Sequence, residues 1–508
     1  MIALIAFALA VVGVPLARMV ALRLNVVAPT DSDSRHDSPM ALLGGAPILA
    51  AILLALGSLT AIPRWMLVGT IGLFAVGLFD DVVALSPKRK LALQAIVVCG
   101  ALSFWRTPLD APWPLVNQAL AAVWLLSTIN AFNLIDGLDG LAAGIGVCAA
   151  LAIAILGASH HDFVTAGAAV AIVGALAGFL LFNAHPASIF MGDCGALPLG
   201  FLLGALALGA GRDAAASSHI LRYVIPILVM LAPLLDMTIA SISRAMTGTP
   251  VTRRGLDHSH HRLLALGLSE RVAVGVCWTV AALSGACAIV AAAIPPVYLI
   301  FAIPIIAAFF GLIACFMIDL TFDARPPRLV EGRLRAVVRF ALDWGYERQV
   351  AEVALDLVLI AVAYVGAFLL RLGLVINDQT VAHLIPNVAL VLAISFSACS
   401  ITGLYRRVWR YTGLPDLVRV ANAAIASGIL LVAASYFLPV MLSGTIAILF
   451  VILMFNLVLL SRVSFVAFHR GIARLADFSS TPGASPTPAA RLNQRDARVA
   501  LSKISGVR

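Results

Sequence analysis

The chain has 508 residues, of which 62% are hydrophobic and only 12% are charged. Soluble domains carry about 25% charged and about 45–50% apolar residues. The mean hydropathy of +1.03 indicates that the apolar excess extends along the whole chain. This composition excludes a soluble multidomain protein, a secreted disulfide-stabilised protein and a disordered chain. It predicts an all-α, polytopic integral membrane protein.

Apolar runs separated by polar breaks predict about 15 transmembrane helices, because each span needs roughly 20 apolar residues. In chain order the runs cover 1–21, 41–62, 66–84, 91–105, 116–132, 138–157, 164–182, 197–211, 221–243, 271–294, 297–318, 350–370, 384–404, 421–440 and 443–461. The first run lacks a basic leading segment and a small-residue cleavage site, so it is interpreted as a span and not as a cleaved signal.

The basic residues predict which face of the membrane is cytoplasmic. One set of loops holds only Arg64, Arg106, Arg212, Arg222 and Arg371, whereas the other set and the C-terminal tail hold all the remaining Lys and Arg. The positive-inside rule then places the N-terminus outside and the C-terminus in the cytoplasm. The net charge of +9 follows from this topology, so nucleic acid is not an expected partner.

Composition also predicts four segments along the chain. A long membrane module covers residues 1–320 with about 11 spans, counted at roughly 20 apolar residues each. A polar, basic cytoplasmic linker covers 321–349, and a four-span membrane module covers 350–475. Residues 476–508 are rich in Ser, Pro and Ala, which is typical of a disordered tail.

The polar residues of the first module are predicted to lie at the cytoplasmic ends of successive spans. Asp80-Asp81 closes the third span, and neighbouring helical residues point roughly 100° apart, so at most one of them is expected to face a shared site. Lys90, in the loop that follows, is within reach of a phosphate. Intramembrane and membrane-edge charges are costly, so this clustering indicates a function.

Two further motifs carry carboxylates on the same face. The first is Asn130-Ala-Phe-Asn133-Leu-Ile-Asp136-Gly-Leu-Asp139-Gly140, whose spacing of three predicts one polar edge of a helix-like turn. The second runs from Asn183 to Asp193, where a proline-containing break and an Asp between glycines predict a loop that presents one carboxylate. Oxygen ligands with room for water and phosphate are those that Mg²⁺ prefers.

A histidine-rich segment, Asp257-His258-Ser259-His260-His261-Arg262, follows the ninth span. Zinc is one interpretation, but there is no cysteine partner and the histidines lie too close together to complete a tetrahedral shell. Beside Arg253 and Arg254, the segment is interpreted as a set of donors to a phosphate.

Taken in order, these motifs resemble the polyprenyl-phosphate N-acetylhexosamine-1-phosphate transferases, a glycosyltransferase family 4 type. The resemblance covers residues 1–320 and includes His36 with Pro39 and Gly44-Gly45, then Gly77-Leu-Phe-Asp80-Asp81, Asn130 to Gly140, Phe182-Asn183, Pro186, Phe190-Met191-Gly192-Asp193, Pro233-x-x-Asp236, Arg244 and the histidine segment before Gly267. The sequence departs from the family at Cys194 and Ala196, where small hydroxyl residues are usual.

The resemblance implies transfer of a sugar-1-phosphate, expected to be N-acetylhexosamine-1-phosphate, from a UDP-sugar to undecaprenyl phosphate, with release of UMP. It implies a multi-pass enzyme of a bacterial inner membrane with its active site on the cytoplasmic face, initiating a lipid-linked envelope glycan. The implied cofactor is Mg²⁺, with Mn²⁺ as an alternative, and a homodimer is left open. Which glycan the product enters, lipopolysaccharide or another envelope polymer, is not predicted.

Residue roles follow from the same resemblance. Asp193 is the expected metal ligand, and the expected catalytic carboxylates are Asp80, Asp81, Asp136 and Asp139, with either Asp80 or Asp81 steering or deprotonating the lipid phosphate. The expected substrate-binding residues are His36, Lys90, Asn130, Asn133, Asn183, Arg244, His258, His260, His261 and Arg262.

Residues 345–475 resemble a second family, the four-span membrane region that precedes the catalytic domain of polysaccharide-biosynthesis nucleotide-sugar dehydratases and epimerases. The matching residues are Arg371, Gly403 to Tyr411 and Asp416. A dinucleotide-binding glycine motif is missing after Arg474, so no reductase or epimerase activity is expected.

Three other functions remain as alternatives: a transporter or lipid flippase, a non-catalytic scaffold for glycan assembly, and an intramembrane prenyltransferase. Transporter sites usually lie near the bilayer midplane between repeats, whereas the charges here gather at one edge. Asp80-Asp81 lacks the later Asp of a prenyltransferase DD-x-x-D motif.

Overall fold

The structure is a computed structural model. It describes residues 1–28, 40–58, 62–105, 109, 113–215, 218–246, 258–299, parts of 302–317, 344–371, 378–405, 414–436 and 444–479. The regular structure of these residues is helical, apart from one isolated β-bridge between Val27 and Ala41.

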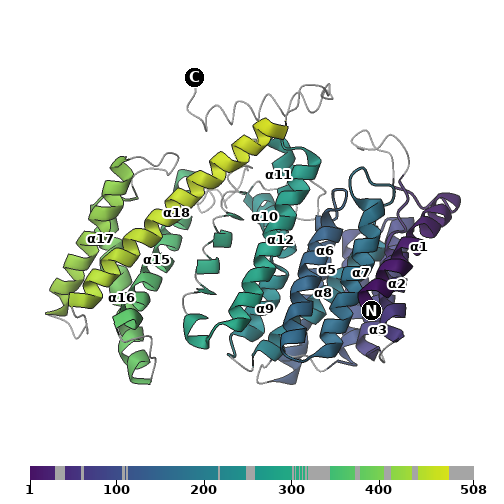
Figure 1. The fold of residues 1–508 in the computed structure, drawn as a ribbon, viewed down its shortest axis with the longest axis horizontal. Coiled ribbons are helices and arrows are strands. Elements are labelled where there is room, and N and C mark those ends of the chain that lie inside the picture. Colours follow the sequence, from purple (N-terminus) through teal and green to yellow (C-terminus); the bar gives the residue numbers. More distant parts are fainter. Residues whose placement is uncertain are drawn as a thin grey trace. The chain divides into compact units, whose positions relative to one another are not determined.

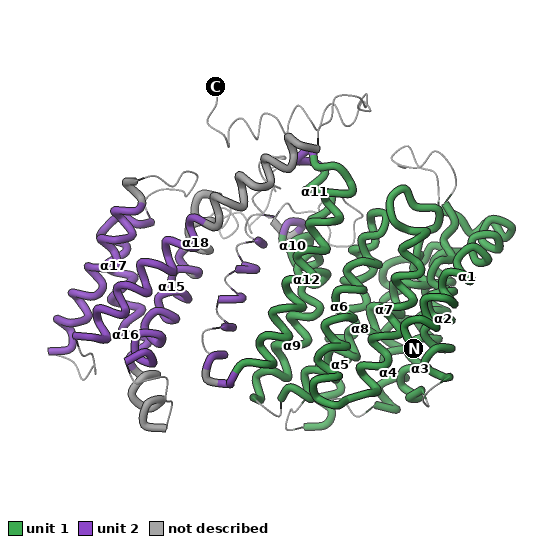
Figure 2. The backbone as a smooth tube through the Cα atoms, viewed as in Figure 1, with its two compact units in different colours: residues 1–242, 250–264, 268–294 green, residues 243–249, 265–267, 295–508 purple. Residues whose placement is uncertain are grey.

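The chain divides into two compact units, which Figure 2 distinguishes by colour. The first unit comprises residues 1–242, 250–264 and 268–294, and the second comprises 243–249, 265–267 and 295–508. The four segment boundaries predicted from composition are not tested by this division and stay predictions.

The helices of the first unit follow the chain from α1 to α12 (Figure 1). Their bounds are α1 Ile2–Arg23, α2 Gly45–Gly57, α3 Arg64–Val83, α4 Pro87–Leu102, α5 Pro114–Ile135, α6 Leu141–Ser159, α7 Phe163–Asn183, α8 Asp193–Ala214, α9 Leu221–Val229, α10 Leu231–Met246, α11 Ser259–Ala265 and α12 Glu270–Ala293. The last residues of α10 belong to the second unit.

Helix α8 forms the centre of the first unit. It packs against α3, α5 and α9, and also against α2 and α6, and its apolar stretch is buried throughout. Most of its residues are Gly, Ala or Leu, and small residues allow neighbouring helices to approach closely in a membrane protein. The N-terminal residue of this central helix is Asp193, so the packing of the bundle positions that carboxylate.

The apolar run 221–243 was predicted as one span, but it forms two helices bent by 77°. Helix α9 ends at Val229, and Pro233 follows four residues later. Proline has no N–H to donate to the Val229 carbonyl, and its ring would clash with that carbonyl if the helix continued. The bend therefore follows from the position of Pro233.

Candidate membrane spans are numerous among the described residues. Nine helices are long and apolar enough to cross a membrane, or up to ten if the bent pair counts as one. Each predicted apolar run contains at least one helix, except 297–318, which is only partly described. These findings confirm an all-α, multi-pass membrane protein; the total of about 15 spans and the orientation of the termini stay predictions.

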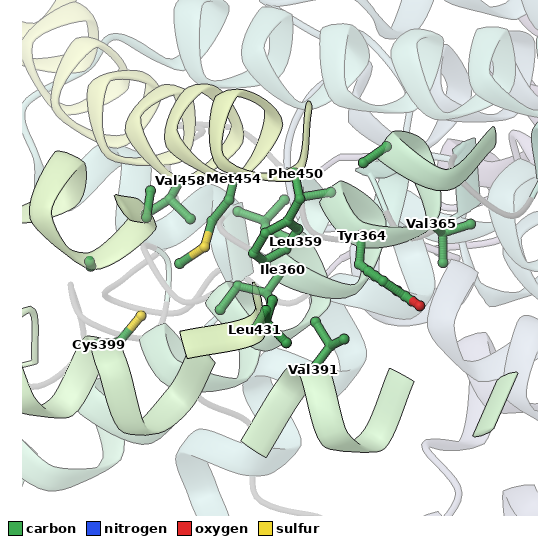
Figure 3. Packing of buried hydrophobic residues seen from close by; sticks show 14 of the residues in the cluster. Leu359, Ile360, Tyr364, Val365, Val391, Cys399, Leu431, Phe450, Met454 and Val458 are labelled. Atoms are coloured by element: carbon green, nitrogen blue, oxygen red, sulfur yellow. The ribbon is translucent and has the colours of Figure 1, made fainter. Parts of the chain in front are cut away.

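The second unit contains four long helices: α15 Trp344–Arg371, α16 Asp378–Ile401, α17 Leu414–Ser435 and α18 Gly444–Ser479. A short 3₁₀ helix, η1, covers Pro296–Tyr298. The contacts α15–α16, α16–α17, α17–α18 and α18–α15 close the four helices into a bundle. Figure 3 shows part of its buried apolar core, in which the rings of Tyr364 and Phe450 lie edge to face at 6.4 Å.

One ion pair lies inside this bundle. Arg462 of α18 donates to Asp356 of α15 at 2.7 Å, and their side chains are 4% and 0% exposed. A buried ion pair is costly to break, because removing one partner leaves an uncompensated charge. The pair therefore joins the first and last long helices of the unit. Most of the predicted motif from Gly403 to Tyr411 lies outside the described residues, which end at Tyr405 in that stretch.

Candidate active site

The site begins with a close contact between the ends of α3 and α8. A Cβ atom on Gly77 would lie 2.3 Å from the carbonyl oxygen of Asp193 and 2.6 Å from the backbone nitrogen of Cys194. Only glycine permits this approach, because real Cβ contacts are much longer. The glycine thus brings the C-terminal end of α3 against the N-terminus of α8.

Asp81, at the end of α3, binds the first turn of α8. Its Oδ1 accepts from the backbone N–H of Asp193 at 2.9 Å, and its Oδ2 accepts from that of Cys194 at 3.0 Å. The first N–H groups of a helix have no partner within the helix, and a carboxylate also interacts favourably with the positive end of the helix dipole. Both carboxylate oxygens of Asp81 are therefore engaged in holding Asp193 in place.

Asp80 faces a different way, as expected for neighbouring helical residues. Its Oδ2 lies 2.9 Å from Lys90 Nζ, and its Oδ1 accepts from the backbone N–H of Leu85 at 2.6 Å. Lys90 also donates to Asp193 Oδ2 at 2.5 Å and to Asn133 Oδ1 at 3.0 Å. The amide of Asn133 in turn donates to Asp193 Oδ1 at 2.5 Å. Lys90 therefore joins residues from α3, α5 and α8.

Helix α5 ends before the predicted polar edge is complete. Its last residue is Ile135, and Asp136 has a non-helical backbone with φ −78° and ψ 62°, so the spacing rule does not extend to Asp136 and Asp139. Asn130 donates instead to Gln94 Oε1 of α4 at 2.8 Å and to the Leu126 carbonyl at 2.7 Å. The contact with Gln94 joins Asn130 to α4, whereas Asn133 contacts Asp193.

Asp136 lies close to several negative charges. Burial and the carboxylates of Asp193, Asp81 and Asp139 raise the pKa of Asp136 to about 7. Carboxylates that share a site disfavour one another's ionisation. A cation among these groups would relieve that repulsion, so the donor set fits a hard divalent metal with oxygen ligands.

A second polar cluster surrounds Asp139, which the sequence predicts as a catalytic carboxylate. Asp139 Oδ2 accepts from the backbone N–H of Ala187 at 2.9 Å and lies 3.0 Å from His185 Nδ1. Glu270 Oε2, at the start of α12, lies 3.7 Å from the same ring nitrogen. The ligand atoms of Asp139, His185 and Glu270 all lie within 4.8 Å of one another, so this group could also hold a metal ion.

Asn183 stabilises the loops beside that cluster. Its Oδ1 accepts from the backbone N–H of Gly140 at 3.0 Å, and its Nδ2 donates to the Ile189 carbonyl at 2.9 Å. The buried amide thus ties the start of α6 to the α7–α8 loop. The sequence predicts Asn183 as a substrate-binding residue, and in the structure both polar atoms of its side chain contact backbone groups.

The histidine segment is fixed by a carboxylate of α10. Asp236 Oδ2 lies 2.8 Å from His258 Nδ1, and its Oδ1 accepts from the backbone N–H of Ser259 at 2.6 Å. His260 contacts the loop after α5, because a Cβ on Gly137 would lie 2.6 Å from His260 Nε2. The segment therefore lies against the loop that carries Asp136.

The remaining predicted residues are Arg262, His261, Arg244 and His36. Arg262 is buried in α11, and the ring centroids of His260 and His261 are 4.3 Å apart. Arg244 is buried near the C-terminal end of α10, in a segment that belongs to the second unit. His36 and Asp257 lie outside the described residues.

Several residues of these clusters were not selected from the sequence. Glu270 is isolated in the sequence from the motifs, so nothing local indicated its contact with His185. Asp236 lies in the Pro233-x-x-Asp236 pattern, which was noted for the resemblance but was given no role. The role of Gly77 depends on a contact between two helices that are distant in the sequence.

The fold and the site define a class of protein. A multi-pass helical bundle brings carboxylates, an amide and a lysine together at the ends of its helices, where phosphate groups and a metal can be bound. The class is a membrane-embedded enzyme of phosphoryl transfer.

Comparison with known proteins gives the family. Residues 64–211 match the family model of glycosyl transferase family 4. The probable undecaprenyl-phosphate N-acetylglucosaminyl 1-phosphate transferase of Bacillus subtilis (strain 168) is 32% identical over 282 residues, which cover 52% of this chain and 77% of the relative. The decaprenyl-phosphate N-acetylglucosaminephosphotransferase of Mycolicibacterium smegmatis is 33% identical over 297 residues, covering 51% of this chain and 73% of the relative.

A third relative is the phospho-N-acetylmuramoyl-pentapeptide-transferase of Shouchella clausii. It is 36% identical over 237 residues, which cover 42% of this chain and 70% of the relative. The chain belongs to glycosyl transferase family 4, and it is a membrane phospho-sugar transferase. The resemblance stated for its first module is confirmed; the resemblance of the second module is not tested by these matches.

Proposed function

We propose that the chain transfers an N-acetylhexosamine-1-phosphate from a UDP-sugar to undecaprenyl phosphate and releases UMP. The observation that carries the proposal is the cluster of Asp80, Lys90, Asn133 and Asp193, joined by contacts of 2.5–3.0 Å at the ends of four helices. Relatives named for transfer of N-acetylglucosamine phosphate to polyprenyl phosphates support this choice of sugar and acceptor.

In the proposed reaction, an oxygen of the lipid phosphate attacks the β-phosphorus of the UDP-sugar. The bond from that phosphorus to the bridging oxygen breaks, and UMP leaves with the electron pair. A phosphate monoester has a second pKa near 6, so the lipid phosphate is largely a dianion at neutral pH. A strong general base is then not required, and the site acts mainly by positioning.

Asp193 is the proposed ligand of the divalent metal, with Asp80, Asp136 and the amide oxygen of Asn133 as neighbouring oxygen donors. We favour Mg²⁺, with Mn²⁺ as a substitute, because all of these donors are hard oxygen atoms. When bound, the metal neutralises charge on the diphosphate and on the leaving UMP.

The other residues have supporting roles in this proposal. Asp81 is a positioning residue, because both of its oxygens bind the backbone of α8. Asp80 is the carboxylate of the pair that faces Lys90 and is the one that would steer the lipid phosphate. Asp139 would support the nucleotide, and the histidine segment held by Asp236 would bind phosphate or sugar.

The proposed location is the inner membrane of a bacterium, with the site on its cytoplasmic face. The positive-inside distribution of Lys and Arg supports this orientation, as does the need for a nucleotide-activated donor. The product would be the first lipid-linked intermediate of an envelope glycan.

The test uses purified full-length protein in nanodiscs with undecaprenyl phosphate, Mg²⁺ and a panel of UDP-N-acetylhexosamines. We expect one donor to give a lipid-linked sugar diphosphate and UMP in equal amounts, and no UMP when the acceptor is omitted. Folded protein that is inert with every donor would overturn the proposal and favour a scaffold or transporter.

A further inference from the structure

Lys90 uses all its hydrogen-bond capacity inside the site. An ammonium group has three N–H donors, and three acceptors surround Nζ: Asp80 Oδ2 at 2.9 Å, Asp193 Oδ2 at 2.5 Å and Asn133 Oδ1 at 3.0 Å. Its side chain is only 15% exposed. Lys90 can therefore bind a phosphate only by releasing one of these three acceptors.

Asp193 is the acceptor that Lys90 can release, because the proposed function assigns the divalent metal to the same carboxylate. A divalent ion and an ammonium held by the same carboxylate would lie within a few ångströms of each other, and their repulsion is strong in a partly buried site. Asn133 also bridges Lys90 and Asp193, so both contacts change together. Asp80 neighbours the proposed metal but is not its assigned ligand, so the contact with Asp80 is the one that Lys90 keeps.

We propose that Lys90 and the divalent metal compete for Asp193, so that metal binding transfers Lys90 from Asp193 to a phosphate of the bound substrate. Lys90 then acts as an exchangeable cation: it neutralises the carboxylates before the metal does, and it becomes a phosphate ligand afterwards. This inference rests on the proposed function, because it requires the metal to bind at Asp193.

The competing explanation is that Lys90 is a fixed link between α4 and its neighbours. If Lys90 is such a fixed link, replacing it would leave the carboxylates less ordered, and metal binding would weaken or stay the same. Exchange predicts the opposite sign, because removing the competitor strengthens metal binding while it weakens phosphate binding.

The experiment titrates Mn²⁺ alone into full-length protein in nanodiscs and follows the paramagnetic resonance signal of the free ion. We expect Lys90→Met to bind Mn²⁺ about tenfold more tightly than wild type, from the charge removed a few ångströms away. Lys90→Gln provides a second neutral variant, and thermal melts confirm that both fold. The matched control is Lys88→Met, which removes the same charge from an exposed position of the same helix.

A second measurement separates exchange from simple charge removal. UMP affinity is measured with and without saturating Mn²⁺. In wild type, the metal should strengthen UMP binding partly because it frees Lys90 to bind the phosphate. The ratio of UMP affinities with and without Mn²⁺ should therefore be about tenfold smaller in Lys90→Met, as expected for loss of one charge-assisted hydrogen bond.

The outcomes are distinct. Tighter Mn²⁺ binding together with the reduced coupling supports exchange. Equal or weaker Mn²⁺ binding by a folded Lys90→Met, or an unchanged effect of Mn²⁺ on UMP affinity, overturns it while leaving the transferase proposal intact. If Asp193→Ala binds Mn²⁺ like wild type, the metal ligand of the proposed function is wrong, and the exchange fails with it.

Discussion

Substitution of Gly77 tests how α3 positions the N-terminus of α8. In Gly77→Ala the new Cβ would lie 2.3 Å from the Asp193 carbonyl oxygen and 2.4 Å from its carbon. Ordinary contact requires about 3.4 Å or more, so the first turn of α8 has to move by about 1 Å, since backbone cannot rotate out of the way. A displacement of about 1 Å in a positioned group can lower a rate by roughly 100-fold.

The assay compares UMP release and thermal stability of Gly77→Ala with those of Gly275→Ala. Gly275 lies in α12, and a Cβ there would meet nothing within 4 Å, so this variant should keep the wild-type rate and be as stable or more stable. We expect Gly77→Ala to lose roughly 100-fold in rate and to melt earlier, because overpacking costs about 1–3 kcal/mol. A Gly77→Ala enzyme within threefold of the wild-type rate would show that the close contact of Gly77 does not position α8 for catalysis.

Two further predictions concern positioning and stability. Asp81→Asn leaves one acceptor oxygen for two backbone donors, so we expect lower turnover with an unchanged pH–rate profile; a profile that loses one limb would instead identify Asp81 as a general base. Arg462→Met leaves Asp356 buried without its ion-pair partner and should lower the free energy of unfolding by about 3 kcal/mol. The double variant Asp356→Leu/Arg462→Met should recover most of that loss in the same denaturation assay, and a double variant no more stable than the single one would argue against the pair.

The fold was predictable from the sequence because a membrane protein reveals its helices through their composition. Most apolar runs contain one helix each, since a lipid environment requires backbone groups to bond within the segment. The bend at Met230 was not predicted, although Pro233 was visible. Length and hydropathy identify an apolar run, but they do not take account of the clash between a proline ring and the carbonyl four residues earlier.

The site was predictable at the level of motifs and less so at the level of contacts. Asn133, Lys90 and Asp193 were selected individually, and the structure brings them together. The different roles of Asp80 and Asp81 depend on which of them faces α8, and the sequence leaves this open. Glu270 was missed because its partner, His185, is distant in the sequence and only folding brings them together.

The proposed function requires Asp193, at the start of α8, for metal-dependent transfer. The most direct test measures UMP release in the presence of Mg²⁺ by wild type, Asp193→Ala and Asp213→Ala. The third variant makes the same change near the other end of α8, where Asp213 contacts Arg212. We predict a loss of roughly 100-fold or more for Asp193→Ala and a rate within twofold of wild type for Asp213→Ala. Equal rates for wild type and Asp193→Ala would show that Asp193 is not required for transfer.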